Sequence, residues 1–301
     1  MKRIILMFLC ASLLLLNVSC GEEKPASESS KEESSDVKSK EESSFTEASE
    51  ESIEESSEEE SALPTSPISV LFVGNSFTFY NDLPVIFENI VKSAGVEATV
   101  RSVTVSSSRL EWFCDPSQSI SKTFGETVDE TVFDYVFLQE HSTRPYKDYD
   151  AFSKGIAEVC AKIREKSPDA AIVLYETWGF NENYSSLKED GMTTKDQELL
   201  LLSSYEKAGE EHSLPVSFAG ITHYKVYKET EYDPYHTDLK HPSYIGSFAS
   251  ALTHYYTVFP KASKESVTFK GKLSDKEFED VRNIAYSVAR NENITKEFKG
   301  E

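Results

Sequence analysis

The chain has 301 residues and a formal net charge of −21, and hydrophobic residues make up 39% of it. A protein that binds nucleic acid by electrostatic attraction needs a basic face, so this acidic excess excludes that class. An anionic membrane surface would also repel the chain, although an N-terminal anchor remains compatible with the charge.

The first twenty residues have the pattern of an export signal. Two basic residues precede an apolar run, residues 4–16, which is too short to span a bilayer. The run is followed closely by Ser19-Cys20, which resembles the lipobox of bacterial lipoproteins. This resemblance implies that Cys20 is lipidated and that the mature protein is extracytoplasmic, held at a bacterial cell membrane only through its lipid. The alternative is an ordinary secreted protein in which Cys20 has no such role.

Residues 21–67 are mostly serine, glutamate and lysine, with 16 acidic residues and four lysines. Apolar side chains are nearly absent, so nothing offsets the conformational entropy that ordering the segment would cost. We predict a disordered Ser/Glu-rich linker, with an acidic binding arm as the alternative. Residues 68–301 are long enough to form one domain with its own core.

Strand and helix patterns alternate along this domain. Apolar runs of strand length occur at 68–73, 98–105, 134–138, 170–175 and 214–219. Helical patterns occur at 82–94, 149–166, 194–211, 242–259 and 274–291. Strands that are apolar throughout are buried on both faces. The sequence therefore predicts an α/β fold, a three-layer α/β/α sandwich around a mostly parallel five-stranded sheet.

Two helix starts carry capping signals. Asp82 is placed to cap the first predicted helix, with Pro84 in its first turn. Ser274 and Glu277 have the spacing of a capping box at the start of the last one. These residues predict where both helices begin.

Two segments at the ends of the domain carry candidate chemistry. Gly-Asn-Ser-Phe-Thr at 74–78 follows the first strand and places Ser76 on a strand-to-helix turn. Asp238 lies three residues before His241, in front of an apolar helix. A carboxylate at this spacing can orient an imidazole, and an oriented imidazole can activate a serine hydroxyl. Taken separately, the first segment predicts only a simple turn. The second predicts only an N-cap beside a surface histidine.

Together the two segments resemble the SGNH (GDSL-like) hydrolase family, with its Gly-Asp-Ser-Leu-like first motif and its Asp-x-x-His last motif. The resemblance covers about residues 68–260. It implies a flavodoxin-like fold and ester hydrolysis with no metal and no cofactor. Ser76 would be the nucleophile, His241 the general base and Asp238 the residue that orients it. We expect a monomer that acts on a small-molecule or glycan ester, with Asn75 at the substrate.

The family's oxyanion-hole motifs are changed in this chain. Besides the Ser76 N–H, the family uses the N–H of a glycine after the second strand, where this chain has Ser106 or Ser107. A backbone N–H survives that replacement, but a glycine needed for its dihedral angles is not easily replaced. The family's third donor, an asparagine, is Gln139 here, which keeps a carboxamide.

Gln139 resembles the Gln-bearing branch of the family, which contains carbohydrate O-acetyl esterases. We therefore predict an extracytoplasmic serine esterase that removes O-acetyl groups from a carbohydrate. The alternative is a tethered carbohydrate-binding lipoprotein on the same fold, with catalysis impaired by the changed oxyanion motif.

For three other groups of residues, the sequence is compatible with two interpretations. Trp178, after the fourth strand, stacks on a sugar ring or belongs to the core. His236, with Asp238 and His241, has a spacing that can hold Zn²⁺. Cys114 and Cys160 are two buried thiols or a disulfide.

Glu140, His141 and the ring-bearing residues after the fifth strand also have alternative interpretations. Glu140 and His141 are interpreted as rim or structural residues, since nothing pairs them with a nucleophile. Ring-bearing residues after the fifth strand either line a substrate loop or pack; they are His223, Tyr224, Tyr227, Tyr232 and Tyr235.

Overall fold

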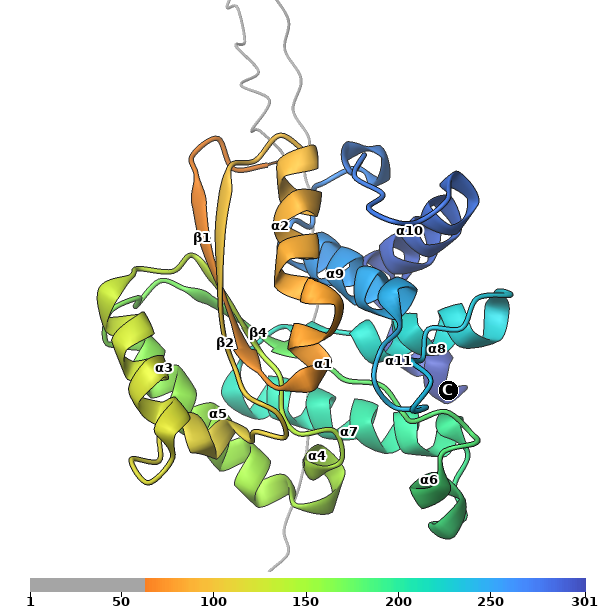
Figure 1. Cartoon of the computed structure of the whole chain (residues 1–301), viewed down its shortest axis with the longest axis horizontal. Helices are drawn as coiled ribbons and strands as arrows, with labels where there is room; N and C mark the ends of the chain where they lie inside the picture. Colours follow the sequence, from red (N-terminus) through yellow and green to blue (C-terminus); the bar gives the residue numbers. More distant parts are fainter. Residues whose placement is uncertain (1–62) are drawn as a thin grey trace, which may run out of the picture. The chain divides into compact units, whose positions relative to one another are not determined.

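The computed structural model describes residues 63–301 (Figure 1). The predicted signal sequence, the lipidation site Cys20 and all but the end of the predicted linker lie outside the described residues. No helix within residues 63–301 has the length and apolar character needed to cross a bilayer.

In the described part of the chain, five strands form one sheet in the order β2-β1-β3-β4-β5, and every neighbouring pair is parallel. The strands are β1 (Ile68–Gly74), β2 (Ala98–Thr104), β3 (Tyr135–Leu138), β4 (Ala171–Tyr175) and β5 (Val216–Ser217). All five predicted strands are present, although β5 has only two residues. The carboxyl ends of the parallel strands share one edge of the sheet, which is where such folds place their sites.

Helices cover both faces of the sheet (Figure 1). They are α1 (Ser76–Phe79), α2 (Leu83–Ser93), α3 (Ser119–Glu130), α4 (Arg144–Lys147), α5 (Tyr149–Arg164), α6 (Ser185–Glu189), α7 (Thr194–His212), α8 (Ala219–Glu229), α9 (Tyr244–Val258), α10 (Asp275–Arg290) and α11 (Ile294–Lys299). Short 3₁₀ turns are η1 (Tyr80–Asp82), η2 (Leu110–Phe113) and η3 (Lys264–Ser266). The predicted helices correspond to α2, α5, α7, α9 and α10, so the α/β/α sandwich is confirmed.

Successive residues of β1 alternate between two cores. Val70 and Phe72 are fully buried and pack in the cluster with α2, α8, α9 and α10. Leu71 and Val73 are also fully buried, but they pack with α3, α5 and α7. Burial of one such side chain contributes about 1.5–3 kcal/mol, so β1 is fixed from both faces. Its end, which leads to Ser76, is fixed with it.

The structure corrects parts of the helix prediction. α3 and α8 were not expected from the sequence. Asp82 takes the N-cap position of α2 with φ +57°, and its side chain makes no capping hydrogen bond. The capping box of Ser274 and Glu277 is confirmed.

Two cysteines lie in the described range. Cys114 and Cys160 are free, partly buried thiols, so no disulfide joins them. Burial raises the pKa of each thiol to about 11. The interpretation as packed, unreactive thiols fits this environment.

Candidate active site

The structure brings Ser76, His241 and Asp238 together at the carboxyl edge of the sheet. Ser76 is the first residue of α1, directly beyond β1, and His241 lies just before α9. The Ser76 Oγ is 2.8 Å from His241 Nε2, and His241 Nδ1 is 2.5 Å from Asp238 Oδ2. Residues 165 positions apart in the sequence thus form a continuous hydrogen-bonded chain.

The backbone of the Asp238 loop fixes the carboxylate as well as the imidazole. Asp238 Oδ1 accepts the N–H groups of Lys240, at 3.2 Å, and His241, at 3.0 Å. Partial burial acts to raise the pKa of Asp238, but the hydrogen bonds from the His241 ring and from these two amides outweigh it and lower the pKa to about 2. Asp238 is therefore ionised at neutral pH and orients the ring through Nδ1. Since both ring nitrogens of His241 are engaged, neither is free for a metal ion in this arrangement.

Tyr80 covers the imidazole. Its ring stacks on that of His241 with centroids 4.2 Å apart and an interplanar angle of 6°. Asn81 and Asp82, which follow it, both have left-handed backbone angles, with φ values of +56° and +57°. Among non-glycine residues, Asn and Asp adopt this conformation most readily, and surrounding contacts fix it here.

Those contacts come from the start of α9. The Asn81 side chain donates to the Pro242 carbonyl at 3.0 Å and to the Ser247 hydroxyl at 2.9 Å. The Ser247 hydroxyl in turn donates to the Tyr80 carbonyl at 3.2 Å. These hydrogen bonds connect the turn after α1 to the segment that carries His241. They keep the rings of Tyr80 and His241 stacked.

Gln139 lies buried beneath the β1–α1 turn. Its Oε1 accepts the Asn75 N–H at 2.8 Å and the Thr78 hydroxyl at 2.9 Å, and its Nε2 donates to the Glu140 carbonyl. Oε1 thus accepts two hydrogen bonds and Nε2 donates one, all within the buried interior. Its expected place as an oxyanion donor is therefore corrected: Gln139 supports the turn.

Asn75 is also part of this support and is 3% exposed. Its Oδ1 accepts the Phe77 N–H at 3.1 Å, and its Nδ2 donates to the Ser108 carbonyl at 3.0 Å. The expected contact between Asn75 and the substrate is not what this arrangement offers. Ser108 is a further support of this turn that the sequence does not predict, since nothing in the run of three serines distinguishes it. It is fully buried, and its hydroxyl donates to the Gly74 carbonyl at 2.8 Å.

Two backbone amides remain as candidates for the oxyanion donors. The N–H groups of Ser76 and Ser107 have no hydrogen-bond acceptor among residues 63–301. Ser107 is exposed and has φ +59°, in the left-handed region that glycine favours. A serine therefore adopts a backbone conformation here that glycine favours. Ser106 is exposed beside it.

Trp178 belongs to the core. It is fully buried between Phe77, with centroids 4.6 Å apart, and His223, with centroids 4.3 Å apart, and the three rings are nearly parallel. Its Nε1 donates to the Lys240 carbonyl at 3.0 Å. No face is open to a sugar, so the stacking role predicted for Trp178 is corrected to support of the loop that carries His241.

Of the two alternatives for the ring-bearing residues after β5, a substrate loop or packing, the structure supports packing. His223, Tyr224 and Tyr227 lie on α8 and not in a loop, and His223 is fully buried. Tyr235 is 4% exposed, and its hydroxyl donates to the Gly179 carbonyl at 2.7 Å. Within this group, packing replaces the substrate loop.

Glu140 joins two of the loops at the sheet edge. Its carboxylate accepts the N–H groups of His141, at 2.6 Å, and Leu110, at 3.3 Å. Burial raises the pKa of Glu140 to about 7. Burial, followed by the positive charges of Arg109 and Lys240, lowers the pKa of the half-buried His141. The structural interpretation of Glu140 agrees with this geometry.

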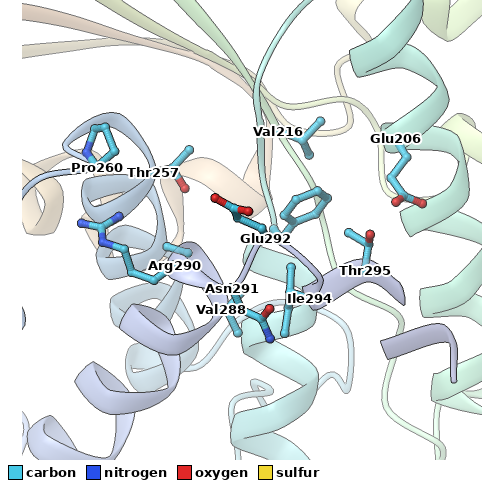
Figure 2. A pocket seen from close by; sticks show the side chains of 12 residues that line it. Glu206, Val216, Thr257, Pro260, Val288, Arg290, Asn291, Glu292, Ile294 and Thr295 are labelled. Carbon is cyan, nitrogen blue, oxygen red and sulfur yellow. The ribbon is translucent and has the colours of Figure 1, made fainter. Parts of the chain in front are cut away.

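A hollow of about 320 Å³ lies elsewhere, between α7, β5, α9, α10 and α11 (Figure 2). None of the triad residues lines it. Arg290 at its wall is already occupied, because its guanidinium donates to the carbonyls of Tyr256, Phe259 and Ala262. We therefore place the candidate site at the triad and not in this hollow.

No protein-family model matches the chain, and no curated protein matches it. Solved structures do match. A protein of Slackia heliotrinireducens described as an SGNH hydrolase has a TM-score of 0.55 and 22% identity, over 64% of this chain and 99% of that one. A DUF4886 family protein of Bacteroides uniformis has a TM-score of 0.59 and 16% identity, over 74% and 94%.

A GDSL-like lipase of Parabacteroides merdae has a TM-score of 0.50 and 12% identity, over 65% of this chain and 97% of that one. Sequence identities this low support a shared fold and nothing more specific. The all-parallel five-stranded sheet with helices on both faces agrees with that likeness. The described part of the chain has the fold of the SGNH hydrolases.

Proposed function

We propose that the protein is a serine ester hydrolase. The observation that carries this proposal is the hydrogen-bonded chain from Ser76 through His241 to Asp238. Within residues 63–301, two amides have no acceptor, that of Ser76 at the start of α1 and that of Ser107 in the loop after β2. A nucleophile, a base, an orienting acid and oxyanion donors are the parts that acyl transfer needs.

The reaction follows from these positions. His241 Nε2 takes the Ser76 hydroxyl proton as Oγ attacks the ester carbonyl carbon, and the developing oxyanion accepts the Ser76 and Ser107 N–H groups. His241 then gives the proton to the leaving alcohol oxygen, which leaves an acyl group on Ser76. Water, activated by the same imidazole, attacks this acyl ester, releases the acid and restores the hydroxyl.

We further propose that the substrate is an O-acetylated carbohydrate and that the enzyme acts outside the cytoplasm, anchored by a lipid on Cys20. The support for the substrate is the resemblance of Gln139 to the Gln-bearing branch of the family, which contains carbohydrate O-acetyl esterases, together with the predicted extracytoplasmic placement. The support for the location is the lipobox-like sequence at Ser19-Cys20. Mass spectrometry of the mature protein and of Cys20→Ser checks the anchor, which the variant is expected to lack.

Hydrolysis of p-nitrophenyl acetate by the full chain tests the esterase proposal. Ser76→Ala and His241→Ala are each expected to lower kcat by about 10⁴-fold or more, since members of such a triad act as a unit. Circular dichroism of both variants controls for folding. Activity that survives Ser76→Ala would overturn the mechanism. If the parent enzyme is active, release of acetate from acetylated oligosaccharides then tests the substrate class.

A further inference from the structure

We propose that Glu176 and Glu198 share one buried proton and that, in this state, they position the loop that carries Asp238 and His241. This inference rests on the proposed function. Glu176 follows β4 and Glu198 lies on α7, and neither has an evident role in the triad chemistry. Both side chains are fully buried.

In each carboxyl group, one oxygen accepts hydrogen bonds and the other has no hydrogen-bond partner within residues 63–301. Glu176 Oε2 accepts the N–H groups of Gly220, at 3.0 Å, and Ile221, at 3.2 Å, in the first turn of α8. Glu198 Oε2 accepts the Gly179 N–H at 2.6 Å. The Oε1 atoms of both glutamates are buried and have no hydrogen-bond partner within residues 63–301.

The two carboxyl groups meet at Gly220. A Cβ on this residue would collide with Glu198 Oε1 and would lie 3.0 Å from Glu176 Cδ. Two ionised carboxylates cannot lie side by side in an apolar interior, because each raises the energy of the other. One proton between them removes a charge and gives both orphan oxygens a hydrogen bond. The geometry therefore favours a singly protonated pair.

The electrostatics of the surroundings agree with this assignment. Burial raises the pKa of both carboxyl groups, and the charge of Glu198 raises that of Glu176 further. The Lys195 ammonium lowers the pKa of Glu198, although less than burial raises it. The other ionisable groups whose charges act on the pair or respond to it are Tyr205, Glu206, Tyr224 and Tyr235.

The pair is connected to the catalytic loop through the β4 exit segment, residues 178–181. Glu198 fixes this segment at the Gly179 N–H. The segment makes three hydrogen bonds to the 235–241 loop. They run from the Tyr235 hydroxyl to the Gly179 carbonyl at 2.7 Å, from Trp178 Nε1 to the Lys240 carbonyl at 3.0 Å, and from the Asn181 N–H to the Leu239 carbonyl at 3.0 Å.

Loss of the shared proton leaves two buried negative charges in contact. Repulsion then separates the carboxyl groups, and the Gly179 amide moves with Glu198. The three hydrogen bonds to the 235–241 loop transmit this shift to Asp238 and His241. Glu176 and Glu198 are thus positioning residues, and their ionisation is expected to end activity on the alkaline side.

Glu198→Gln tests the proposal, because its Oε1 can accept the Gly179 N–H while its Nε2 donates to Glu176 at every pH. Against p-nitrophenyl acetate from pH 6 to 10, we expect the alkaline fall of kcat/KM to move upward by about one pH unit or more in this variant. Glu176→Gln is the mirror variant and should act alike. Glu210→Gln, at an exposed position on α7, is the matched control and should follow the parent profile.

Fluorescence of Trp178 supplies a readout that does not need activity. In a Trp112→Phe background, the emission should change with pH over the same range in the parent and stay constant when Glu198→Gln is added. An unchanged alkaline limb and an unchanged fluorescence titration in both Gln variants would overturn the proposal. If no variant and no parent hydrolyses the ester, the proposed function fails, and the fluorescence titration still decides whether the pair shares a proton.

Discussion

Tyr80 lies flat against the imidazole of His241, which becomes charged in the proposed reaction. When His241 takes the Ser76 proton, the face of the tyrosine ring, 4.2 Å away, attracts the resulting cation. Such an attraction is worth about 0.5–2 kcal/mol, which corresponds to about 2- to 30-fold in rate. Tyr80→Leu should therefore lower kcat by this factor, whereas Tyr80→Phe keeps the ring and should keep the rate.

Steady-state kinetics of the two variants measure this effect. Their melting temperatures serve as the control, since a collapsed turn at Asn81 would lower kcat for another reason. Equal losses in Tyr80→Phe and Tyr80→Leu would point to the hydroxyl group and against the ring face.

Variants of Ser107 test whether this residue acts through its backbone N–H or through its side-chain hydroxyl. Its φ of +59° costs a residue with a Cβ about 1–2 kcal/mol relative to the right-handed region. Ser107→Gly removes this strain but gives the unfolded chain more freedom, so the free energy of unfolding should change by less than about 1 kcal/mol.

The Ser107 N–H is present in glycine and alanine alike. If it is the oxyanion donor, Ser107→Ala and Ser107→Gly should both keep kcat within about twofold of the parent, because no donor of the kind worth about 10²–10³ in kcat is lost. Kinetics with p-nitrophenyl acetate check this. A loss near 100-fold in both variants would mean instead that the hydroxyl group takes part.

At the scale of elements, the sequence predicted what depends on local periodicity. β1 is apolar at every inward position, and α10 has both a capping box and an apolar stripe, so each was located to within about a residue. α3 buries only Phe124, Thr127 and Val128 along twelve residues, and this pattern is too weak to predict a helix. α8 was missed because its aromatic residues resembled those of a binding loop.

The residues of the triad were predictable because they stand in short local motifs. The residues that support the triad were not, because their partners are distant in the sequence. Ser76, Asp238 and His241 stand in two short motifs whose spacing is visible in the sequence. Gln139 accepts hydrogen bonds from residues 61 and 64 positions away, and Trp178 donates to a residue 62 positions away. Only the folded chain shows whether a carboxamide or an indole faces a ligand or the interior. The sequence places Gln139 in the oxyanion hole and Trp178 at the substrate, whereas both side chains support the loops.

The β1–α1 turn gives a prediction at this scale. A Cβ on Gly74 would lie 2.5 Å from Gln139 Oε1 and 2.6 Å from Thr78 Oγ1, so Gly74→Ala must displace the carboxamide that supports the turn. We expect a loss of about 1–3 kcal/mol in the free energy of unfolding, typical of overpacking, together with a large loss of kcat.

Gly125 is the matched control. It lies within α3, and nothing is within 4 Å of a Cβ placed there. Gly125→Ala should stabilise the protein by about 0.5–1 kcal/mol through helix propensity and leave kcat unchanged. Urea unfolding and ester hydrolysis of both variants provide the comparison. If Gly74→Ala were as stable and active as the parent, the packing of Gln139 described above would be wrong.

At the scale of the whole molecule, buried ionisable groups give opposing responses to acid. Burial lowers the pKa of His254 to about 3, below its unfolded value of about 6.5, so the unfolded chain binds more protons between these pH values and stability falls as the pH falls. Burial raises the pKa of Glu140 to about 7, so the native state binds more protons between about pH 7 and 4.5, and stability rises as the pH falls. The two trends partly cancel.

A variant at His254 separates the contribution of this histidine from that of Glu140. His254 is fully buried, with Nδ1 2.7 Å from the Ser217 hydroxyl, a hydrogen bond that glutamine can keep. The stability of the parent relative to His254→Gln should fall by about 1.4 kcal/mol per pH unit from pH 6.5 downward, or about 2–3 kcal/mol by pH 4.5. His236→Gln, at a half-exposed side chain, is the histidine control. Urea unfolding at half-unit steps of pH measures the difference, and parallel curves for the parent and His254→Gln would show that the buried imidazole does not set the acid response of the fold.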